Sequence, residues 1–226
     1  MSEMNLKQEE AQRQENISEK VSVANRFMDE NKKIIYGVVI AVLVIGLGIL
    51  AYNQWISKPK QAEAMEQMFP AENSFAAGEF EIALNGDGNN LGFKDIISEY
   101  GSHAGRAATF YAGVCELQLG NYEEAISYLK KYKGKDAILM GRATACIGDA
   151  YVGLEDYKTA VTYFEKAAAQ ADNIFAATYL LKAGIAYEAL GQKDKALSCY
   201  KTIKDQYPQS VEGYDIDKYI SRIEAE

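Results

Sequence analysis

Few residues in this 226-residue chain have the types and spacing that catalysis or metal binding requires. His103 is the only histidine, so histidine-based triads and metal clusters have little to build on. Cys115, Cys146 and Cys199 are well separated and form no C-x-x-C pair, which favours three small apolar residues in helix packing over a zinc site or a disulfide framework. No phosphate loop, nucleophile elbow or H-E-x-x-H motif is present. We therefore expect no enzyme, no catalytic residue, no cofactor and no metal site.

One segment, NGDGNN at residues 85–90, is similar to the start of a calcium-binding loop. The calcium pattern D-x-[DN]-x-[DN]-G requires glycine where Asn90 stands, and glutamate where Ile96 stands. Because these positions do not match, we expect a tight turn between two helices.

Three glycines recur at a nearly constant spacing and predict a helical repeat. Gly113, Gly148 and Gly184 are 35 and 36 residues apart. Glycine inside a helix costs about 1 kcal/mol relative to alanine, so three in one register indicate the close approach of a second helix. The small residues expected on that facing helix lie twelve positions downstream: Ala125, Ala160 and Ala196.

The same pattern predicts where the helices end. Gly120 and Gly191 occupy positions where a turn requires positive φ. Over residues 106–208 the chain resembles the tetratricopeptide repeat, a 34-residue helix–turn–helix with small residues at these relative positions. Two departures from the family pattern are Glu155 in place of the turn glycine and Lys193 in place of the turn tyrosine.

The resemblance implies an all-α solenoid of stacked helical hairpins with a concave side, because one hairpin cannot bury its own apolar face. We assign three repeats to residues 105–208. Residues 57–104 are predicted to form a linker helix and a degenerate first hairpin, and residues 209–226 a C-terminal capping helix.

By the same resemblance, the first helix of each repeat lines the concave side and forms a candidate groove for a peptide or partner. Its residues are Phe110, Val114, Leu117, Cys146, Asp149, Leu181, Lys182, Ile185 and Glu188. Family members that clamp a C-terminal carboxylate have asparagines where Val114, Asp149 and Ile185 stand, so a clamp of that kind is not expected. A mixed apolar and acidic groove fits an extended peptide or a partner helix. The alternative is that the C-terminal helix fills the groove.

A run of 23 residues without charge, residues 34–56, predicts one transmembrane helix. Such a helix is about 34 Å long, enough for a bilayer core of about 30 Å. A cleaved signal peptide fits less well, because 33 residues precede the run and no small-x-small cleavage site follows it. We expect an uncleaved anchor.

Charges near this segment predict its orientation. Lys20, Arg26, Lys32 and Lys33 precede the segment, whereas only Lys58 and Lys60 follow it closely, which favours a cytoplasmic N-terminus. Residues 57–226 carry 18 Lys/Arg and 25 Asp/Glu, net −7, so a basic face for nucleic acid is not expected.

Two further patterns concern helix faces near the membrane. Gly37, Ala41 and Gly48 fall on one stripe of the transmembrane helix, a candidate packing face for another membrane helix. The cytoplasmic tail, residues 1–33, carries apolar residues at helical spacing that predict a short amphipathic helix: Ile17, Val21, Ala24, Phe27 and Met28.

The order of the tail, the anchor and the repeats along the chain is the basis of a second resemblance. A tail with Arg26-Phe27 and ENKK at residues 30–33 leads into a single anchor, a degenerate hairpin and then the repeats. This order resembles the ancillary SecYEG translocon subunits (YfgM-like proteins) of Gram-negative bacteria, and the loop at residues 85–93 is similar to the Bacteroidetes type.

The second resemblance implies a protein of the bacterial inner membrane whose repeat domain lies in the periplasm. There it would assist exported proteins beside the SecYEG translocon, together with a periplasmic chaperone of the peptidyl-prolyl isomerase type. The alternative is a scaffold subunit of another envelope complex, such as the division or outer-membrane assembly machinery. Fold alone does not separate these two functions.

Overall fold

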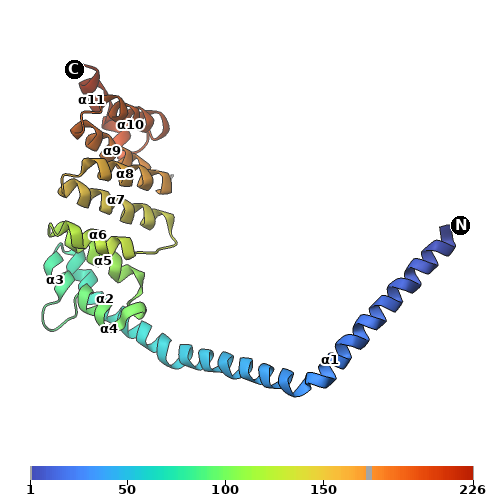
Figure 1. The fold of residues 1–226 in the computed structure, drawn as a ribbon. Coiled ribbons are helices and arrows are strands. Elements are labelled where there is room, and N and C mark those ends of the chain that lie inside the picture. The colour runs from blue at the N-terminus through green and yellow to red at the C-terminus, as the bar shows by residue number, and fades with distance from the viewer. Residues whose placement is uncertain (1, 172–174, 226) are drawn as a thin grey trace. The chain divides into compact units, whose positions relative to one another are not determined.

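The structure is a computed structural model that describes residues 2–171 and 175–225 (Figure 1). The predicted all-α fold is confirmed, because the described residues form helices and no strand. The chain divides into two compact units, one ending at Lys58 and one spanning Pro59–Glu226.

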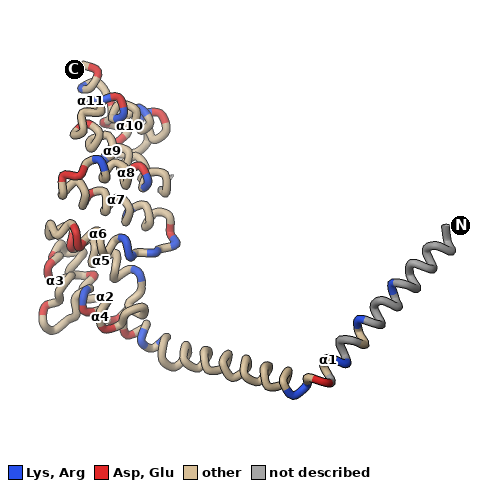
Figure 2. Tube along the Cα trace, viewed as in Figure 1, with Lys and Arg blue, Asp and Glu red and all other residues tan. Residues whose placement is uncertain are grey.

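The first unit is a long helix, α1 (Ser2–Tyr52), followed by a π-helical turn, η1 (Asn53–Ser57). The helical stretch Glu30–Ala76 is long and apolar enough to cross a membrane, with a mean hydropathy of 2.9 in its most apolar part. The large apolar side chains between Ile34 and Ile56 are mostly exposed, and Figure 2 shows this uncharged stretch as a continuous tan tube.

The structure describes only part of the apolar face predicted for residues 1–33. Val21, Phe27 and Met28 are exposed on α1. The side chains of Ile17 and Ala24 are not among those that the structure describes.

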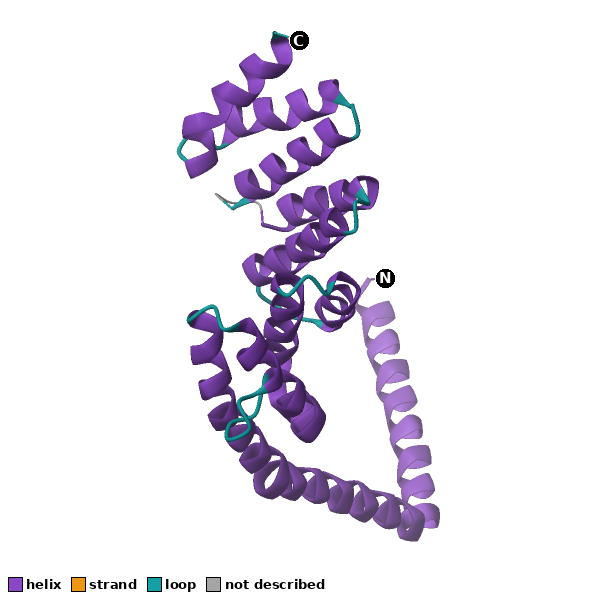
Figure 3. Ribbon diagram, turned by 90° about the vertical axis from the view of Figure 1, so that its left-hand side faces the viewer, coloured by secondary structure: helices purple, strands orange, loops and turns teal. Residues whose placement is uncertain are grey.

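The second unit is a stack of helices (Figure 3). It begins with α2 (Lys58–Ala76), α3 (Phe80–Asn85), α4 (Phe93–Tyr100) and the 3-10 turn η2 (Gly101–Ala104). Three hairpins follow: α5 (Gly105–Gln118) with α6 (Tyr122–Lys131), α7 (Ala137–Gly153) with α8 (Tyr157–Ala171), and α9 (Ala176–Ala189) with α10 (Lys193–Gln206). The chain then forms α11 (Val211–Glu224).

The mid-helix glycines lie where the two helices of each hairpin pack most closely. A Cβ placed at Gly113 would lie 2.7 Å from Leu129 Cγ, and one at Gly148 would lie 2.6 Å from Phe164 Cε1. A Cβ at Gly184 would likewise collide with the ring of Tyr200. The side chain over each glycine is therefore the large residue sixteen positions downstream, whereas the alanines twelve positions downstream are fully buried.

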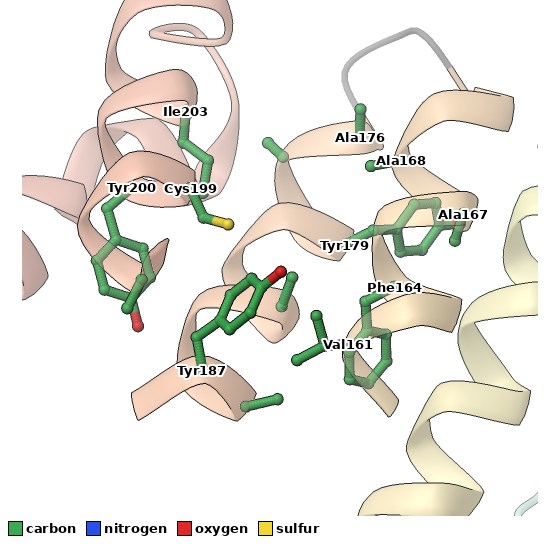
Figure 4. Packing of buried hydrophobic residues seen from close by; sticks show 14 of the residues in the cluster. Val161, Phe164, Ala167, Ala168, Ala176, Tyr179, Tyr187, Cys199, Tyr200 and Ile203 are labelled. Carbon is green, nitrogen blue, oxygen red and sulfur yellow. The ribbon is translucent and has the colours of Figure 1, made fainter. Parts of the chain in front are cut away.

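Figure 4 shows the core around the second and third of these hairpins. Phe164 and Val161 of α8 pack beside Tyr187 of α9, and Tyr200 of α10 lies on the other side of α9. Tyr187 Oη donates a hydrogen bond to Glu165 Oε1 at 2.6 Å, and Tyr200 Oη donates to Glu188. These hydroxyl groups keep polar partners although their rings are buried.

The predicted degenerate first hairpin packs against α5 through aromatic rings. Phe93 of α4 stacks on Tyr111 of α5 with ring centroids 5.2 Å apart, and Phe75 of α2 meets the same tyrosine edge-on at 4.9 Å. An ion pair ties the same helices together, because Lys94 Nζ lies 2.8 Å from Oε1 of Glu116. The carboxylate of Glu116 is buried, with 1% exposed, and it also accepts a hydrogen bond from Asn121 Nδ2.

The C-terminal helix lies beside α9 and α10. Thr178 Oγ1 donates to Glu212 Oε1 at 2.6 Å, and Arg222 Nη2 lies 2.6 Å from Glu188 Oε2. Both pairs are 34 residues apart, which is one repeat length, so α11 occupies the place of the first helix of a further hairpin. Its residues Ile216 and Ile220 are buried.

The turns confirm the positive φ predicted at Gly120 and Gly191, where φ is 81° and 69°. Glu155 occupies the equivalent turn after α7 and adopts a φ of 59° without being glycine. A left-handed conformation costs a non-glycine residue roughly 1–2 kcal/mol.

Glu155→Gly is therefore expected to stabilise the repeat unit by about 0.5–1 kcal/mol, after the greater flexibility of glycine in the unfolded chain is subtracted. Thermal unfolding of the full chain in detergent micelles, followed by circular dichroism, measures this gain. Glu155→Ala is the control, because it keeps the left-handed strain. Equal midpoints for the two variants would contradict the assignment of strain to this turn.

Candidate protein-interaction groove

The first helices of the three repeats line an open cavity of about 390 Å³, here called the central cavity. It is lined by Val114, Leu117, Gln118, Ile138, Leu139, Arg142, Ala145, Cys146, Asp149, Phe175, Thr178, Tyr179 and Lys182. The helices α5, α7 and α9 supply all of these residues except Phe175, which directly precedes α9. Their spacing of about one repeat brings equivalent positions side by side.

A charge pair in the lining of the central cavity joins two consecutive repeats. Lys182 Nζ on α9 donates to Asp149 Oδ1 at 2.8 Å and to Oδ2 at 2.7 Å on α7. The lysine also lies 5.9 Å from the centre of the Phe164 ring. The pair neutralises the carboxylate of Asp149 and joins the second repeat to the third.

Cys146 lines the same cavity as a protonated thiol. Burial raises its pKa to about 11, and the neighbouring Asp149 carboxylate acts in the same direction. Burial raises the pKa of Cys115 to about 12 and that of Cys199 to about 11. Nucleophilic cysteines have depressed pKa values, so none of these thiols is activated.

A second cavity of about 360 Å³, here called the proximal cavity, adjoins the first. It is lined by Glu72, Phe75, Ala76, Arg106, Ala107, Phe110, Tyr111, Tyr132, Leu139 and Arg142. Leu139 and Arg142 of α7 line both cavities. We call the two cavities together the groove.

The structure brings together six of the nine residues predicted for the groove. Val114, Leu117, Cys146, Asp149 and Lys182 line the central cavity, and Phe110 lines the proximal cavity. The other three lie on α9 but line neither cavity. Leu181 packs against the core, Ile185 is exposed, and Glu188 pairs with Arg222 of α11.

The C-terminal helix does not line either cavity. All described residues around the two cavities come from α2, from the first helices α5, α7 and α9, or from the segments that flank them. The sequence left open whether α11 fills the groove, and in the structure its contacts are instead with α9 and α10.

Sequence reasoning missed the two arginines of the groove. Arg106 and Arg142 line it, so its charged side chains are two acids and three bases, and it is not the apolar and acidic groove that was expected. The two arginines do not belong to the recurring pattern of the repeat, because the residue type at exposed positions can differ from one repeat to the next. Aligning the first helices by their central glycines would have placed both residues near the start of a first helix.

In the loop that is similar to a calcium site, the carboxylate of Asp87 forms hydrogen bonds within the loop itself. Asp87 Oδ1 accepts hydrogen bonds from the backbone nitrogens of Asn89 and Asn90, and Oδ2 accepts one from Asn90 Nδ2. These bonds lower the pKa of Asp87. Residues 2–171 and 175–225 contain no cluster of metal-ligating side chains.

The predicted packing stripe of Gly37, Ala41 and Gly48 has no neighbour within the described chain. A Cβ placed at Gly37 or Gly48 would meet no atom within 4 Å, and the whole apolar stretch around Ala41 is exposed.

Comparisons with known proteins agree with this geometry. Residues 99–137, 147–173 and 178–210 each match a model of the tetratricopeptide repeat. The chain thus carries tetratricopeptide repeats, and its class is that of a helical protein-interaction scaffold.

Two solved structures share the fold. A crystal structure of MamA protein is similar with a TM-score of 0.55 and 18% identity, covering 74% of this chain and 83% of that one. A second MamA crystal structure gives a TM-score of 0.52 at 18% identity, with 69% and 92% covered. The comparison with curated proteins found no match. At this identity the likeness concerns the fold alone.

Proposed function

We propose that this protein is a membrane-anchored scaffold that holds an extended segment of a partner protein in the groove between α5, α7 and α9. The observation that carries the proposal is the pair of adjoining cavities, lined by first helices of consecutive repeats and not filled by α11. Apolar walls with a few polar groups are typical of peptide-binding grooves.

The anchor in this proposal is the apolar stretch of α1. A run of exposed large apolar side chains from Ile34 to Ile56 is unfavourable in water and favourable in a bilayer. The stripe of Gly37, Ala41 and Gly48 would then face another membrane helix, because small residues allow close helix approach in lipid.

For the cellular setting we propose the periplasmic side of the bacterial inner membrane, beside the SecYEG translocon. Two observations support this setting. The tail, apolar segment, degenerate hairpin and repeats follow one another in the order that resembles ancillary translocon subunits, and Lys and Arg are in excess on the N-terminal side of the apolar segment. The partners would be the translocon, exported chains and a chaperone of the peptidyl-prolyl isomerase type. The second candidate is a scaffold subunit of a division or outer-membrane assembly complex.

The groove is tested by adding a charge where the two cavities meet. Leu139 is 42% exposed and lines both cavities, so Leu139→Glu should preserve the fold and weaken partner binding at least tenfold, since a carboxylate would replace an apolar contact. The measurement is quantitative co-purification of translocon components and the chaperone with the full chain in mild detergent.

The matched control is Ile185→Glu. Ile185 is 48% exposed on α9 and lines neither cavity, so the same change there should leave co-purification unaltered. Equal losses in both variants would argue against the groove. Recovery of division or outer-membrane assembly proteins instead would favour the second candidate, and protection of the repeat unit from protease added to spheroplasts would reverse the proposed orientation.

A further inference from the structure

The groove carries two arginines that form no ion pair with an acidic side chain among the described residues. Arg106 on α5 and Arg142 on α7 both line the proximal cavity, and Arg142 also lines the central cavity. Among the ion pairs of the described residues none involves either arginine. Both side chains are exposed to solvent.

The charge of the groove is opposite to that of the unit around it. Its lining has three bases, Arg106, Arg142 and Lys182, and two acids, Glu72 and Asp149. Lys182 is already bound to Asp149 at 2.7 Å. The two arginines therefore outnumber the single remaining acid, Glu72, although residues 57–226 as a whole have a net charge of −7. A local excess of positive charge in an acidic unit favours an anionic occupant of the groove.

The arginines sit beside apolar and aromatic side chains. Phe110 and Tyr132 pack together in the proximal cavity with ring centroids 5.4 Å apart, and Leu139 lies between the two cavities. A polypeptide can supply both apolar side chains and carboxylates to such a surface. A small inorganic anion would leave the apolar wall without a contact.

We infer that the groove selects an extended peptide with two carboxylates about three residues apart and an apolar side chain between them. An extended chain in the polyproline II conformation advances about 3.1 Å per residue and completes one turn every three residues, so side chains at i and i+3 lie on the same side, about 9 Å apart. This spacing matches that of neighbouring helices, which pack about 8–10 Å apart, so carboxylates at i and i+3 match arginines on α5 and α7. The planar guanidinium can bind each carboxylate through two hydrogen bonds. This inference rests on the proposed function, because it names the ligand chemistry of the same groove.

Synthetic peptides test the inference with the full chain in detergent micelles. The probe is a fluorescein-labelled, C-terminally amidated peptide containing Leu-Glu-Ala-Leu-Glu-Ala, and its matched partner carries Gln in place of both Glu. Fluorescence anisotropy should show the Glu probe binding at least tenfold more tightly at low salt, with the difference shrinking as salt rises. A free-acid form of the Gln probe shows whether a terminal carboxylate can serve as one of the two anions.

Substituting the arginines tests whether they cause the preference for the Glu probe over the Gln probe. Arg106→Gln and Arg142→Gln should each weaken the Glu probe roughly fivefold and leave the Gln probe unchanged. Lys166→Gln is the control, because it removes an exposed positive charge from α8, which lines neither cavity. Both probes should bind this variant as they bind the unaltered protein.

The outcomes separate the inference from the proposed function. Equal binding of the Glu and Gln probes, abolished by Leu139→Glu, would overturn the anionic preference and keep the peptide groove. No binding of either probe at about 1 mM would contradict both. Concentration-dependent dimers that disappear in Arg142→Gln would show that the groove is occupied by a second copy of this acidic chain, which also overturns the inference.

Discussion

Gly148→Leu is expected to destabilise the repeat unit by about 2–3 kcal/mol, lowering the unfolding midpoint by roughly 5–10 °C. A Cβ alone at this position would lie 2.6 Å from Cε1 of Phe164, whose side chain is buried in the core with 1% exposed. The gain in helix propensity over glycine, about 1 kcal/mol, offsets only part of the overpacking. Thermal unfolding by circular dichroism measures the change.

The pairing of Gly148 with Phe164 is tested by a double-variant cycle. Phe164→Ala alone should cost about 3–5 kcal/mol, because it opens a cavity in the core. Combined with Gly148→Leu, the new leucine occupies that space, so the double variant should be at least 1 kcal/mol more stable than the sum of the single losses. Thr162→Leu, at an exposed position of α8, controls for the added leucine. Strict additivity would show that the two residues do not face each other.

Lys94→Met is expected to cost about 2–3 kcal/mol, because it leaves the carboxylate of Glu116 buried without its cation. Removal of one partner from a fully buried pair costs about 3–5 kcal/mol, and we reduce this figure because the side chain of Lys94 is 38% exposed. The Glu116 carboxylate also raises the pKa of Lys94, as expected for a cation held by this acid. The unfolding midpoint of the full chain measures the loss.

Two variants isolate the buried charge as the cause. Lys94→Met combined with Glu116→Gln should recover most of the lost stability, since the amide carries no charge and keeps its contact with Asn121. Lys204→Met breaks an ion pair of similar length, 2.7 Å to Asp217, but both side chains are more than half exposed. That variant should lose much less stability than Lys94→Met, because solvent screens an exposed ion pair. Equal losses for Lys94→Met and Lys204→Met would contradict the account.

The packing rules of the repeat made much of the fold predictable from sequence. Gly113, Gly148 and Gly184 predicted helix hairpins because glycine inside a helix requires a close neighbour, and the turn glycines predicted the positive φ values that the structure has. The residue that contacts each glycine was harder to predict, because Leu129, Phe164 and Tyr200 differ in type and share only their spacing from the glycine.

The groove was less predictable than the fold. The resemblance placed Val114, Leu117 and Cys146 on the first helices, and the structure brings them to one cavity. It did not single out Arg106 or Arg142, because their charge is independent of the helix packing that defines the repeat. Nor could it foresee that Glu188 pairs with Arg222, because that contact depends on where the last helix lies.

The most direct test of the account is site-specific photo-crosslinking in intact cells, with a photoreactive amino acid at Leu139 in the groove and at Thr162 on α8. The account predicts adducts to exported chains or translocon components from position 139, and a loss of those adducts when Arg106 and Arg142 are both changed to Gln. Position 162 should give none of them. The same adducts from both positions, or adducts only to division or outer-membrane assembly proteins, would contradict it.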